Sequence, residues 1–209
     1  MDKQRADIVI SVLERVYPDA VCSLTYDEPY QLMIAARLSA QCTDARVNMV
    51  TPALFERFHS IEDFASAEVS EIEGYIRSCG LYHTKAVSIR DMCRALLDRG
   101  KVIPDTVEEL TKLPGIGRKT ANLIVGDVFG KPAVVCDTHC IRISGRLGFT
   151  ESKDPLTVEK DLRALLPEDK SSDLCHRFVL FGRDVCTARN PRCGDCPIKA
   201  ALDGYECRI

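Results

Sequence analysis

The chain has 209 residues, 45% hydrophobic and 28% charged, with a formal net charge of −3 at pH 7. This composition is ordinary for a globular protein, and no uncharged run approaches the roughly 18 residues of a membrane-spanning helix, which argues against a membrane protein. No signal-peptide-like hydrophobic stretch follows the N-terminus, so we expect a cytosolic location. Residues 1–110 carry 12 Lys/Arg and 18 Asp/Glu, and residues 111–209 carry 16 and 13. Because phosphates are neutralised by locally placed cations, this balance does not exclude a nucleic-acid partner.

Apolar residues recur at helical spacing along almost the whole chain, and no alternating strand pattern appears. The first amphipathic face comprises Ile8, Val9, Val12, Leu13 and Val16. Further helices are predicted over residues 30–40, 44–58, 67–77, 84–98, 106–112, 118–129, 138–146, 156–166 and 171–182. The connections are short, and we predict an all-α fold.

Several predicted helices begin with residues that favour an N-terminal cap. Thr43 precedes the helix at 44, Thr106 is followed three residues later by Glu109, and 171–173 reads Ser-Ser-Asp. Hydroxyl and carboxylate oxygens at such positions accept hydrogen bonds from backbone N–H groups of the first turn.

A glycine-rich turn, Leu-Pro-Gly-Ile-Gly, lies at 113–117 between two predicted helices. We expect Pro114 to end the first helix, and Gly115 and Gly117 to allow a tight reversal with left-handed backbone angles. Arg118 and Lys119 then open the next helix, whose unpaired N–H groups and positive dipole end suit a phosphate. A plain helix–helix turn with a solvated Lys119 is the alternative that these residues alone leave open.

The segment 136–139, Cys-Asp-Thr-His, follows an apolar run and precedes another helix. Asp137 is expected to cap that helix. A carboxylate fixed there could also stabilise positive charge that develops on a substrate. We interpret His139 as structural.

Eleven cysteines are an odd number, and no secretion signal accompanies them, so a disulfide framework is not expected. Seven are scattered mostly among apolar residues and are predicted to be small core side chains: Cys22, Cys42, Cys79, Cys93, Cys136, Cys140 and Cys175. The other four, Cys186, Cys193, Cys196 and Cys207, lie close together near the end of the sequence. Thiolates so spaced bind zinc or an iron–sulfur cluster, and the spacing does not separate the two.

These segments together resemble the endonuclease III family of helix-hairpin-helix DNA glycosylases, from about residue 30 onward. The string Leu-Pro-Gly-Ile-Gly-Arg-Lys-Thr-Ala-Asn at 113–122 is similar to the family's DNA-binding hairpin and the nucleophilic lysine that follows it. The resemblance implies that Lys119 is the nucleophile and that Gly115, Gly117 and Arg118 contact DNA. Asp137 matches the essential aspartate of the family's Val-Asp-Thr-His string, with cysteine in place of valine.

Two shorter segments resemble the family's base-extruding elements. Residues 38–44, Leu-Ser-Ala-Gln-Cys-Thr-Asp, match the segment whose glutamine fills the space left by an extruded nucleotide, which implies that role for Gln41. Residues 79–82, Cys-Gly-Leu-Tyr, match a turn whose apolar residue wedges into the base stack, which implies Leu81. Ser39 and Asp44 are expected to line the lesion pocket. Taken singly, Gln41 could end a helix, Asp44 could cap one, and Leu81 could be a core residue.

The cysteine segment resembles the family's four-iron–four-sulfur segment, which favours this cluster over zinc. The family places its fourth cysteine after five residues, whereas ten separate Cys196 from Cys207. Because lengthening a closed loop costs little free energy, we expect the extra residues to loop out and Cys207 to complete the set. Arg189 and Arg192 are predicted to contact DNA phosphates, and the cluster is expected to be structural.

The resemblance implies a two-lobed fold, with a helical barrel domain at 21–130, an iron–sulfur cluster domain at 1–20 plus 131–209, and a DNA groove between them. The implied function is that of a bifunctional DNA glycosylase/AP lyase. Such an enzyme excises damaged bases, here with oxidised pyrimidines expected, and nicks the strand by β-elimination through a lysine Schiff base. We expect a monomer in the bacterial cytosol, associated with the nucleoid and acting on double-stranded DNA with damaged bases or abasic sites. The alternatives are a related glycosylase with another lesion preference, one without lyase activity, and a non-catalytic DNA-binding protein.

Overall fold

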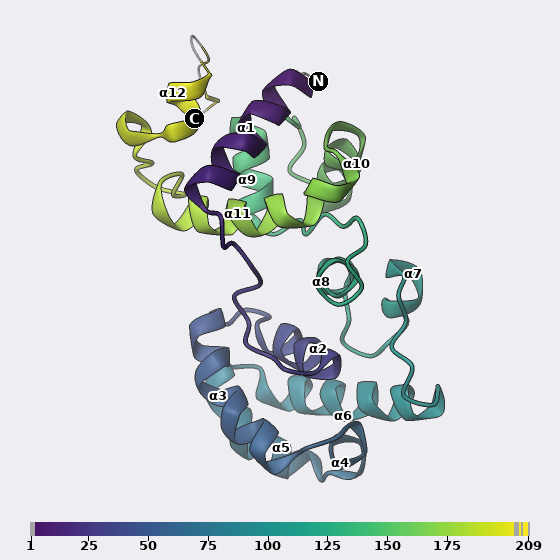
Figure 1. Cartoon of the computed structure of the whole chain (residues 1–209). Helices are drawn as coiled ribbons and strands as arrows, with labels where there is room; N and C mark the ends of the chain where they lie inside the picture. The colour runs from purple at the N-terminus through teal and green to yellow at the C-terminus, as the bar shows by residue number, and fades with distance from the viewer. Residues whose placement is uncertain (1–2, 203–204, 206, 209) are drawn as a thin grey trace. The chain divides into compact units, whose positions relative to one another are not determined.

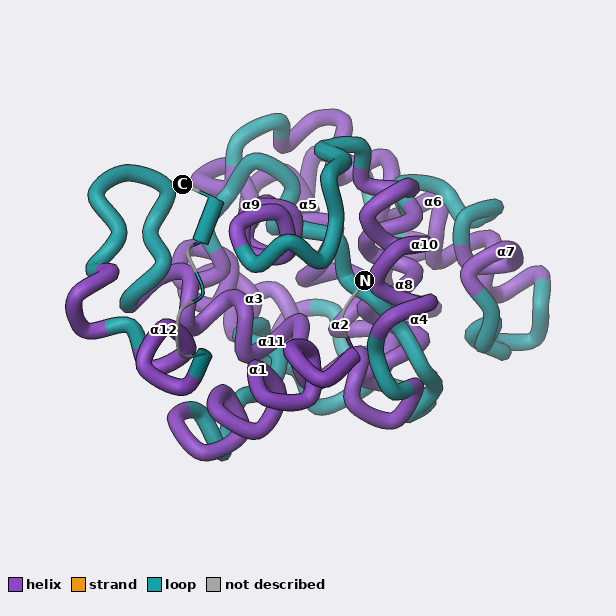
Figure 2. The backbone as a smooth tube through the Cα atoms, turned by 90° about the horizontal axis from the view of Figure 1, so that it is seen from above, coloured by secondary structure: helices purple, strands orange, loops and turns teal. Residues whose placement is uncertain are grey.

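The computed structural model describes residues 3–202, 205, 207 and 208. Regular secondary structure in this part of the chain is helical throughout, which confirms the predicted all-α class (Figure 2). The α-helices are α1 (Lys3–Val16), α2 (Pro29–Leu38), α3 (Asp44–Arg57), α4 (Ile61–Ser66), α5 (Val69–Ile76), α6 (Tyr82–Asp98), α7 (Val107–Leu110), α8 (Arg118–Asp127), α9 (Thr138–Arg146), α10 (Pro155–Leu165), α11 (Ser171–Asp184) and α12 (Pro197–Ala201). Short 3-10 turns are η1 (Arg77–Cys79), η2 (Glu168–Lys170) and η3 (Cys193–Asp195). Within the described ranges, the helices all fall short of the length and apolar character that a membrane span requires.

The chain divides into two compact units, Ser23–Phe129 and Met1–Cys22 with Gly130–Ile209. In the first, α6 packs against α4 and α5, while α2 packs against α3, α6 and α8 (Figure 1). Its core is apolar and is built mainly from Leu32, Met33, Ile34, Leu54, Phe58, Phe64, Ile72, Ile76, Ile89, Met92, Leu96 and Ile124.

The second unit joins both ends of the chain. Helix α1 packs against α11 and α12, and α9 packs against α10 and α11 (Figure 1). The buried face of α1 contains Val9, Val12 and Leu13 as predicted, but Ile8 is only half-buried and Val16 is exposed. Ala6 and Ile10 are buried in their place, so the expected face was rotated by part of a turn.

Two helices were not predicted. Helix α4 begins after Ser60, whose hydroxyl accepts a hydrogen bond from the Asp63 N–H at 3.1 Å. It has only six residues, so it offers too few turns for helical periodicity to be visible. Helix α12, with five residues, follows Cys196.

Helix starts agree with two of the three predicted caps. Thr43 and Thr106 accept from the N–H groups of Arg46 and Glu109, at 3.3 Å each. At α11 the capping residue is instead Lys170, and the Ser171 hydroxyl donates to the Glu168 carbonyl of the preceding 3-10 turn.

Candidate functional site

The hairpin between α7 and α8 is anchored by two buried side chains, Leu113 and Ile116. The Ile116 N–H donates to the Leu113 carbonyl at 3.2 Å, which closes a four-residue turn. Pro114 and Gly115 occupy its central positions, the sequence preference of a type II turn. Helix α7 ends at Leu110, four residues before Pro114, so the expected helix end at residue 112 was wrong.

The two hairpin glycines serve different purposes. Gly115 has φ +77°, and a Cβ there would lie 2.8 Å from the Ser88 Cβ and 2.9 Å from the Arg37 Nε. Gly117 has φ −90° and ψ 171°, an extended conformation open to any residue, and a Cβ there would meet nothing within 4 Å. The left-handed angle predicted for both glycines is therefore present at Gly115 and wrong for Gly117.

Lys119 lies in the first turn of α8, with Gly117 as the capping residue. Its side chain is exposed, as is that of Arg118. Asn122, one turn further along, is buried and donates from its amide to the Arg118 carbonyl at 3.2 Å. The buried Asn122 thus stabilises the first turn of α8. Arg118 and Lys119 lie on its exposed side, next to the helix N–H groups that have no partner within the helix.

Asp137 caps α9, as the sequence predicted. Its Oδ1 accepts from the Cys140 N–H at 2.7 Å, and the residue is half-buried. His139 lies 3.0 Å from the Arg142 guanidinium and packs where a Cβ on Gly182 of α11 would collide with it. These contacts agree with the structural role expected for His139.

Gln41 and Leu81 both adopt left-handed backbone conformations, with φ 55° and φ 48°. Helix α2 ends at Leu38, two residues earlier than predicted, because the chain turns there through Ser39 to Gln41. Leu81 is 56% exposed, which excludes the core-leucine interpretation. Non-glycine residues in this region cost about 1–2 kcal/mol each, and such strain tends to concentrate at functional segments.

The two predicted pocket residues are engaged within the same unit. The Ser39 hydroxyl donates to the Ala36 carbonyl at 2.9 Å. Asp44 accepts from the Ser23 hydroxyl at 2.5 Å and lies in the first turn of α3, so Thr43 rather than Asp44 caps that helix.

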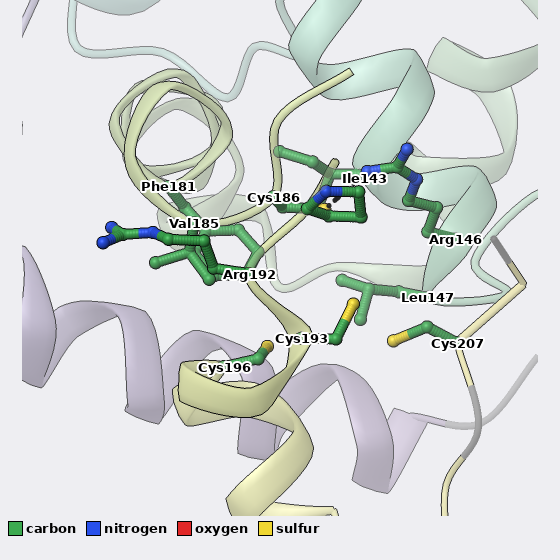
Figure 3. A pocket seen from close by; sticks show the side chains of 11 residues that line it. Ile143, Arg146, Leu147, Phe181, Val185, Cys186, Arg192, Cys193, Cys196 and Cys207 are labelled. Carbon is green, nitrogen blue, oxygen red and sulfur yellow. Dashed lines mark hydrogen bonds between the residues drawn. The ribbon is translucent and has the colours of Figure 1, made fainter. Parts of the chain in front are cut away.

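Four cysteine side chains line one cavity in the unit that contains both chain ends (Figure 3). They are Cys186, Cys193, Cys196 and Cys207, all half-buried. The walls between them are apolar and include Ile143, Leu147, Phe181 and Val185. Within the described residues, no three thiol, imidazole or carboxylate groups are grouped as a single ion would require. The four thiols line this cavity, and four soft sulfur ligands in an apolar wall fit an iron–sulfur cluster.

Two residues that flank Cys207 hold this cysteine at the cavity by hydrogen bonds to α9. The Tyr205 hydroxyl and the Arg208 N–H both donate to the Arg146 carbonyl, at 3.2 Å and 3.0 Å. The Arg5 guanidinium lies 4.3 Å from the Tyr205 ring centroid. Within the spacer predicted to loop out, Asp203, Gly204 and Glu206 lie outside the described residues.

Sequence reasoning missed the residue that joins α9 to this cavity. The Arg146 guanidinium donates to the Cys186 Sγ at 3.2 Å (Figure 3). It also donates to the Thr187 carbonyl at 2.8 Å. Arg142, one turn earlier, donates to the Cys186 carbonyl at 3.0 Å. The helix that begins with Asp137 therefore holds the loop that follows Cys186.

The two arginines of that loop differ in their surroundings. Arg192 donates to the Asp184 carbonyl at 2.8 Å and pairs with the Asp184 carboxylate. Arg189 is exposed beside Asn190, whose φ is 52°. Arg192 thus closes the loop, while Arg189 lies on its outer surface.

The scattered cysteines are only partly a core set. Five are buried, namely Cys79, Cys93, Cys136, Cys140 and Cys175. Cys22 and Cys42 are half-buried, so the core prediction was wrong for them. Burial raises the pKa of the Cys93 thiol to about 12, consistent with an inert packing role.

Comparison with protein-family models gives two matches. Residues 34–168, more than half of the chain, match the model of the HhH-GPD superfamily base excision DNA repair proteins. Residues 186–200 match the iron-sulfur binding domain of endonuclease III.

Individual proteins are similar in sequence to this chain over nearly its full length. Endonuclease III of Synechocystis sp. is 45% identical over 94% of this chain and 90% of its own. Endonuclease III of Bacillus subtilis is 40% identical over 95% of this chain and 91% of its own. A solved structure of a trapped endonuclease III–DNA covalent intermediate, an estranged-adenine complex, superposes with a TM-score of 0.91. It is 42% identical and covers 100% of this chain and 96% of its own.

Proposed function

Because this chain belongs to the endonuclease III family of helix-hairpin-helix base excision DNA repair proteins, we propose that Lys119 and Asp137 are its catalytic residues. The protein is a DNA glycosylase and AP lyase, its partner is DNA, and it binds a four-iron–four-sulfur cluster. The predicted family, activity and cofactor are thereby confirmed. The roles of individual residues are our proposal.

The main observation that supports this proposal is the exposed Lys119, which directly follows the hairpin. Its neutral Nζ attacks C1′ of the damaged nucleotide, and the N-glycosidic bond breaks as the base leaves with the bonding electrons. Ring opening gives a Schiff base between Nζ and C1′. Loss of a C2′ proton then expels the 3′ phosphate by β-elimination, which nicks the strand, and water releases the lysine.

Asp137 supplies the negative charge for this chemistry. The departing base leaves positive charge on the sugar, and a carboxylate held in a fixed direction by the Cys140 N–H stabilises it without reorganising. The same carboxylate can accept a proton from the attacking amine.

The hairpin and the two strained segments handle the DNA. The fold does not need a glycine at Gly117, whereas a phosphate that approaches the backbone there does. We assign Gly115, Gly117 and Arg118 to the DNA backbone, Gln41 to the space left by the extruded nucleotide, and Leu81 to the wedge. Ser39 and Asp44 are proposed for the lesion pocket, and the exposed Arg189, with Arg192, for phosphate contacts.

The cluster ligands are proposed to be Cys186, Cys193, Cys196 and Cys207, which line one cavity. When bound, the cluster cross-links four thiolates from two chain segments and thereby fixes the loop that presents Arg189. We propose that the compact units are the predicted domains, a barrel at 21–130 and a cluster domain at 1–20 plus 131–209.

Borohydride trapping tests the lysine. Hydride reduces the imine to a stable secondary amine, so the wild-type protein should form a covalent adduct with DNA that contains an abasic site. Lys119→Ala should form none, whereas Lys112→Ala, at an exposed lysine of the same hairpin region, should trap normally. An adduct that persists in Lys119→Ala would assign the nucleophile elsewhere.

Three finer expectations complete the proposal. Oxidised pyrimidines are the proposed lesions, by resemblance to the family. The enzyme is proposed to act as a monomer on double-stranded DNA, without a membrane partner. A cytosolic, nucleoid-associated location follows from a chromosomal substrate, and the relatives compared above are bacterial proteins.

A further inference from the structure

A fully buried lysine lies outside the catalytic chemistry. Lys85, in the first turn of α6, has 0% exposure, which is rare for lysine. Its ammonium donates two hydrogen bonds to main-chain oxygens, at 2.8 Å to Leu38 and at 2.9 Å to Cys79. One buried cation therefore joins two segments that are far apart in the sequence.

Both acceptors are carbonyls at helix ends. Leu38 is the last residue of α2, and Cys79 is the last residue of η1. Such carbonyls lack an N–H partner within their own helix, and the C-terminus of a helix such as α2 carries partial negative charge. An ammonium group satisfies both at once. Burial lowers the pKa of Lys85, so the site is maintained at an electrostatic cost.

Each carbonyl lies two or three residues before a strained, exposed residue. Gln41 follows Leu38 by three residues, and Leu81 follows Cys79 by two. Both have positive φ, and both are exposed. Burial, together with the neighbouring Cys42 thiol, raises the pKa of the Cys79 thiol to about 11, and both thiols act on the pKa of Lys85, so the two segments lie close together at the ammonium. Left-handed residues persist only where their surroundings hold them.

We propose that Lys85 is a positioning residue that ties the Gln41 and Leu81 segments together, so that both side chains enter the duplex as one rigid unit. This rests on the proposed roles of Gln41 and Leu81 in extruding the nucleotide. Lys85 itself touches no substrate. Its loss should impair steps that require an opened duplex and spare the chemistry of Lys119.

The test compares two substrates under single-turnover conditions. Lys85→Met retains an unbranched side chain but removes both donors. Excision of a damaged base from duplex DNA should slow about tenfold or more, since small misplacements of positioning groups cost up to a hundredfold. Cleavage of a single-stranded oligonucleotide with an abasic site needs no wedge and should be little changed. A 2-aminopurine base beside the lesion should brighten less on binding than with the wild-type protein.

Matched variants separate positioning from simple destabilisation. Met92→Ala removes another fully buried α6 side chain, two turns away, and should lower thermal stability while affecting both substrates alike. Lys85→Gln keeps a neutral amide that can still donate, on a shorter side chain, and should give an intermediate defect if Lys85→Met does not fold. In a Leu81→Ala background, Lys85→Met should add little further loss.

Two results would overturn the proposal. One is an equal loss on both substrates, and the other is unimpaired duplex excision by a folded Lys85→Met. Failure of the proposed function would look different, because Leu81→Ala and Gln41→Ala would then excise the base from duplex DNA as fast as the wild-type protein.

Discussion

Among single residues, Gly115 and Gly117 show how two neighbouring glycines can be needed for separate reasons. Gly115 combines φ +77° with close approach to Ser88 and Arg37, so any side chain there is both strained and crowded. Gly117 has an extended backbone and open space in front of its Cα. Folding accounts for the first glycine but not for the second, which fits the proposed approach of a DNA phosphate to Gly117.

Alanine at each position should therefore give opposite results. Gly115→Ala should lower the free energy of unfolding by about 1–3 kcal/mol, because the left-handed angle and the contact with Ser88 both act against it. Gly117→Ala should change it by less than about 0.5 kcal/mol but weaken binding to abasic-site DNA about tenfold, through one lost charge-assisted hydrogen bond. Denaturant unfolding and fluorescence-anisotropy titration measure the two effects. Normal DNA affinity in a folded Gly117→Ala would contradict the proposed phosphate contact.

The residues that could be proposed from the sequence have partners nearby in the chain, whereas those that were missed have distant main-chain partners. Lys119 and Asp137 lie in contiguous strings, and a capping aspartate has its partner three residues away. Lys85 and Arg146 act on main-chain carbonyls up to 47 residues distant. A carbonyl has no side-chain identity, so nothing in the sequence marks it as a partner.

Among the secondary-structure elements, α9 links the proposed chemistry to the cysteine cavity. Asp137 caps its first turn, and the Arg146 side chain at its last residue donates to Cys186. Substitutions at the two ends of the helix should therefore have different effects.

At the first end, Asp137→Asn retains an oxygen that can cap α9 but removes the charge. Excision should fall by about a hundredfold or more while the unfolding free energy stays nearly constant. Asp137→Ala should lose the activity and, in addition, about 1 kcal/mol of stability. Single-turnover excision and urea unfolding provide the measurements. An asparagine variant with wild-type excision would show that the carboxylate serves only as a cap.

At the other end, Arg146→Met should leave the Cys186 thiolate and the Thr187 carbonyl without their donor. Because hydrogen bonds to cluster sulfurs and their surroundings tune such sites, the cluster should be lost faster in air or with a chelator. Visible absorbance per protein measures retention. Arg15→Met, at an exposed residue of α1, is the control. Unchanged retention would mean that the contact with Cys186 does not stabilise the site.

Helices were predictable where amphipathic periodicity ran over several turns, as in α3, α6, α9 and α11. The failures were short elements whose limits depend on tertiary contacts. Helix α7 stops early because the hairpin turn must seat Leu113 and Ile116 in the core. Helix α2 ends at Leu38, where the chain turns and the terminal carbonyl accepts from Lys85, a partner distant in the sequence.

On the scale of the whole molecule, one compact unit depends on residues from both ends of the chain. Helix α1, whose Leu13 is buried, packs against α11 and α12. Tyr17, just after this helix, donates to the Asp184 carboxylate at 3.0 Å. Asp184 also pairs with Arg192 of the cysteine loop. The N-terminal segment is thus connected to that loop through one carboxylate.

This connection should be sensitive to alkali. Burial, together with the hydrogen bond to Asp184, raises the pKa of Tyr17 from 10.0 to about 12. The folded state therefore holds the proton more tightly than the unfolded state does. The stabilisation is fully present below pH 10 and is lost as the pH rises from about 10 to about 12, where a tyrosinate would face a carboxylate.

Tyr17→Phe should cost about 0.5–1.5 kcal/mol at neutral pH, the net value of one hydrogen bond. Its melting temperature should fall less steeply than that of the wild-type protein above pH 10, so the two curves should converge. Calorimetry from pH 7 upward measures both, with Tyr75→Phe in the other unit as the reference. Because the variants share all other ionisable groups, only the difference between curves reports on Tyr17. Parallel curves would mean that the Tyr17–Asp184 hydrogen bond does not contribute to the dependence of stability on pH.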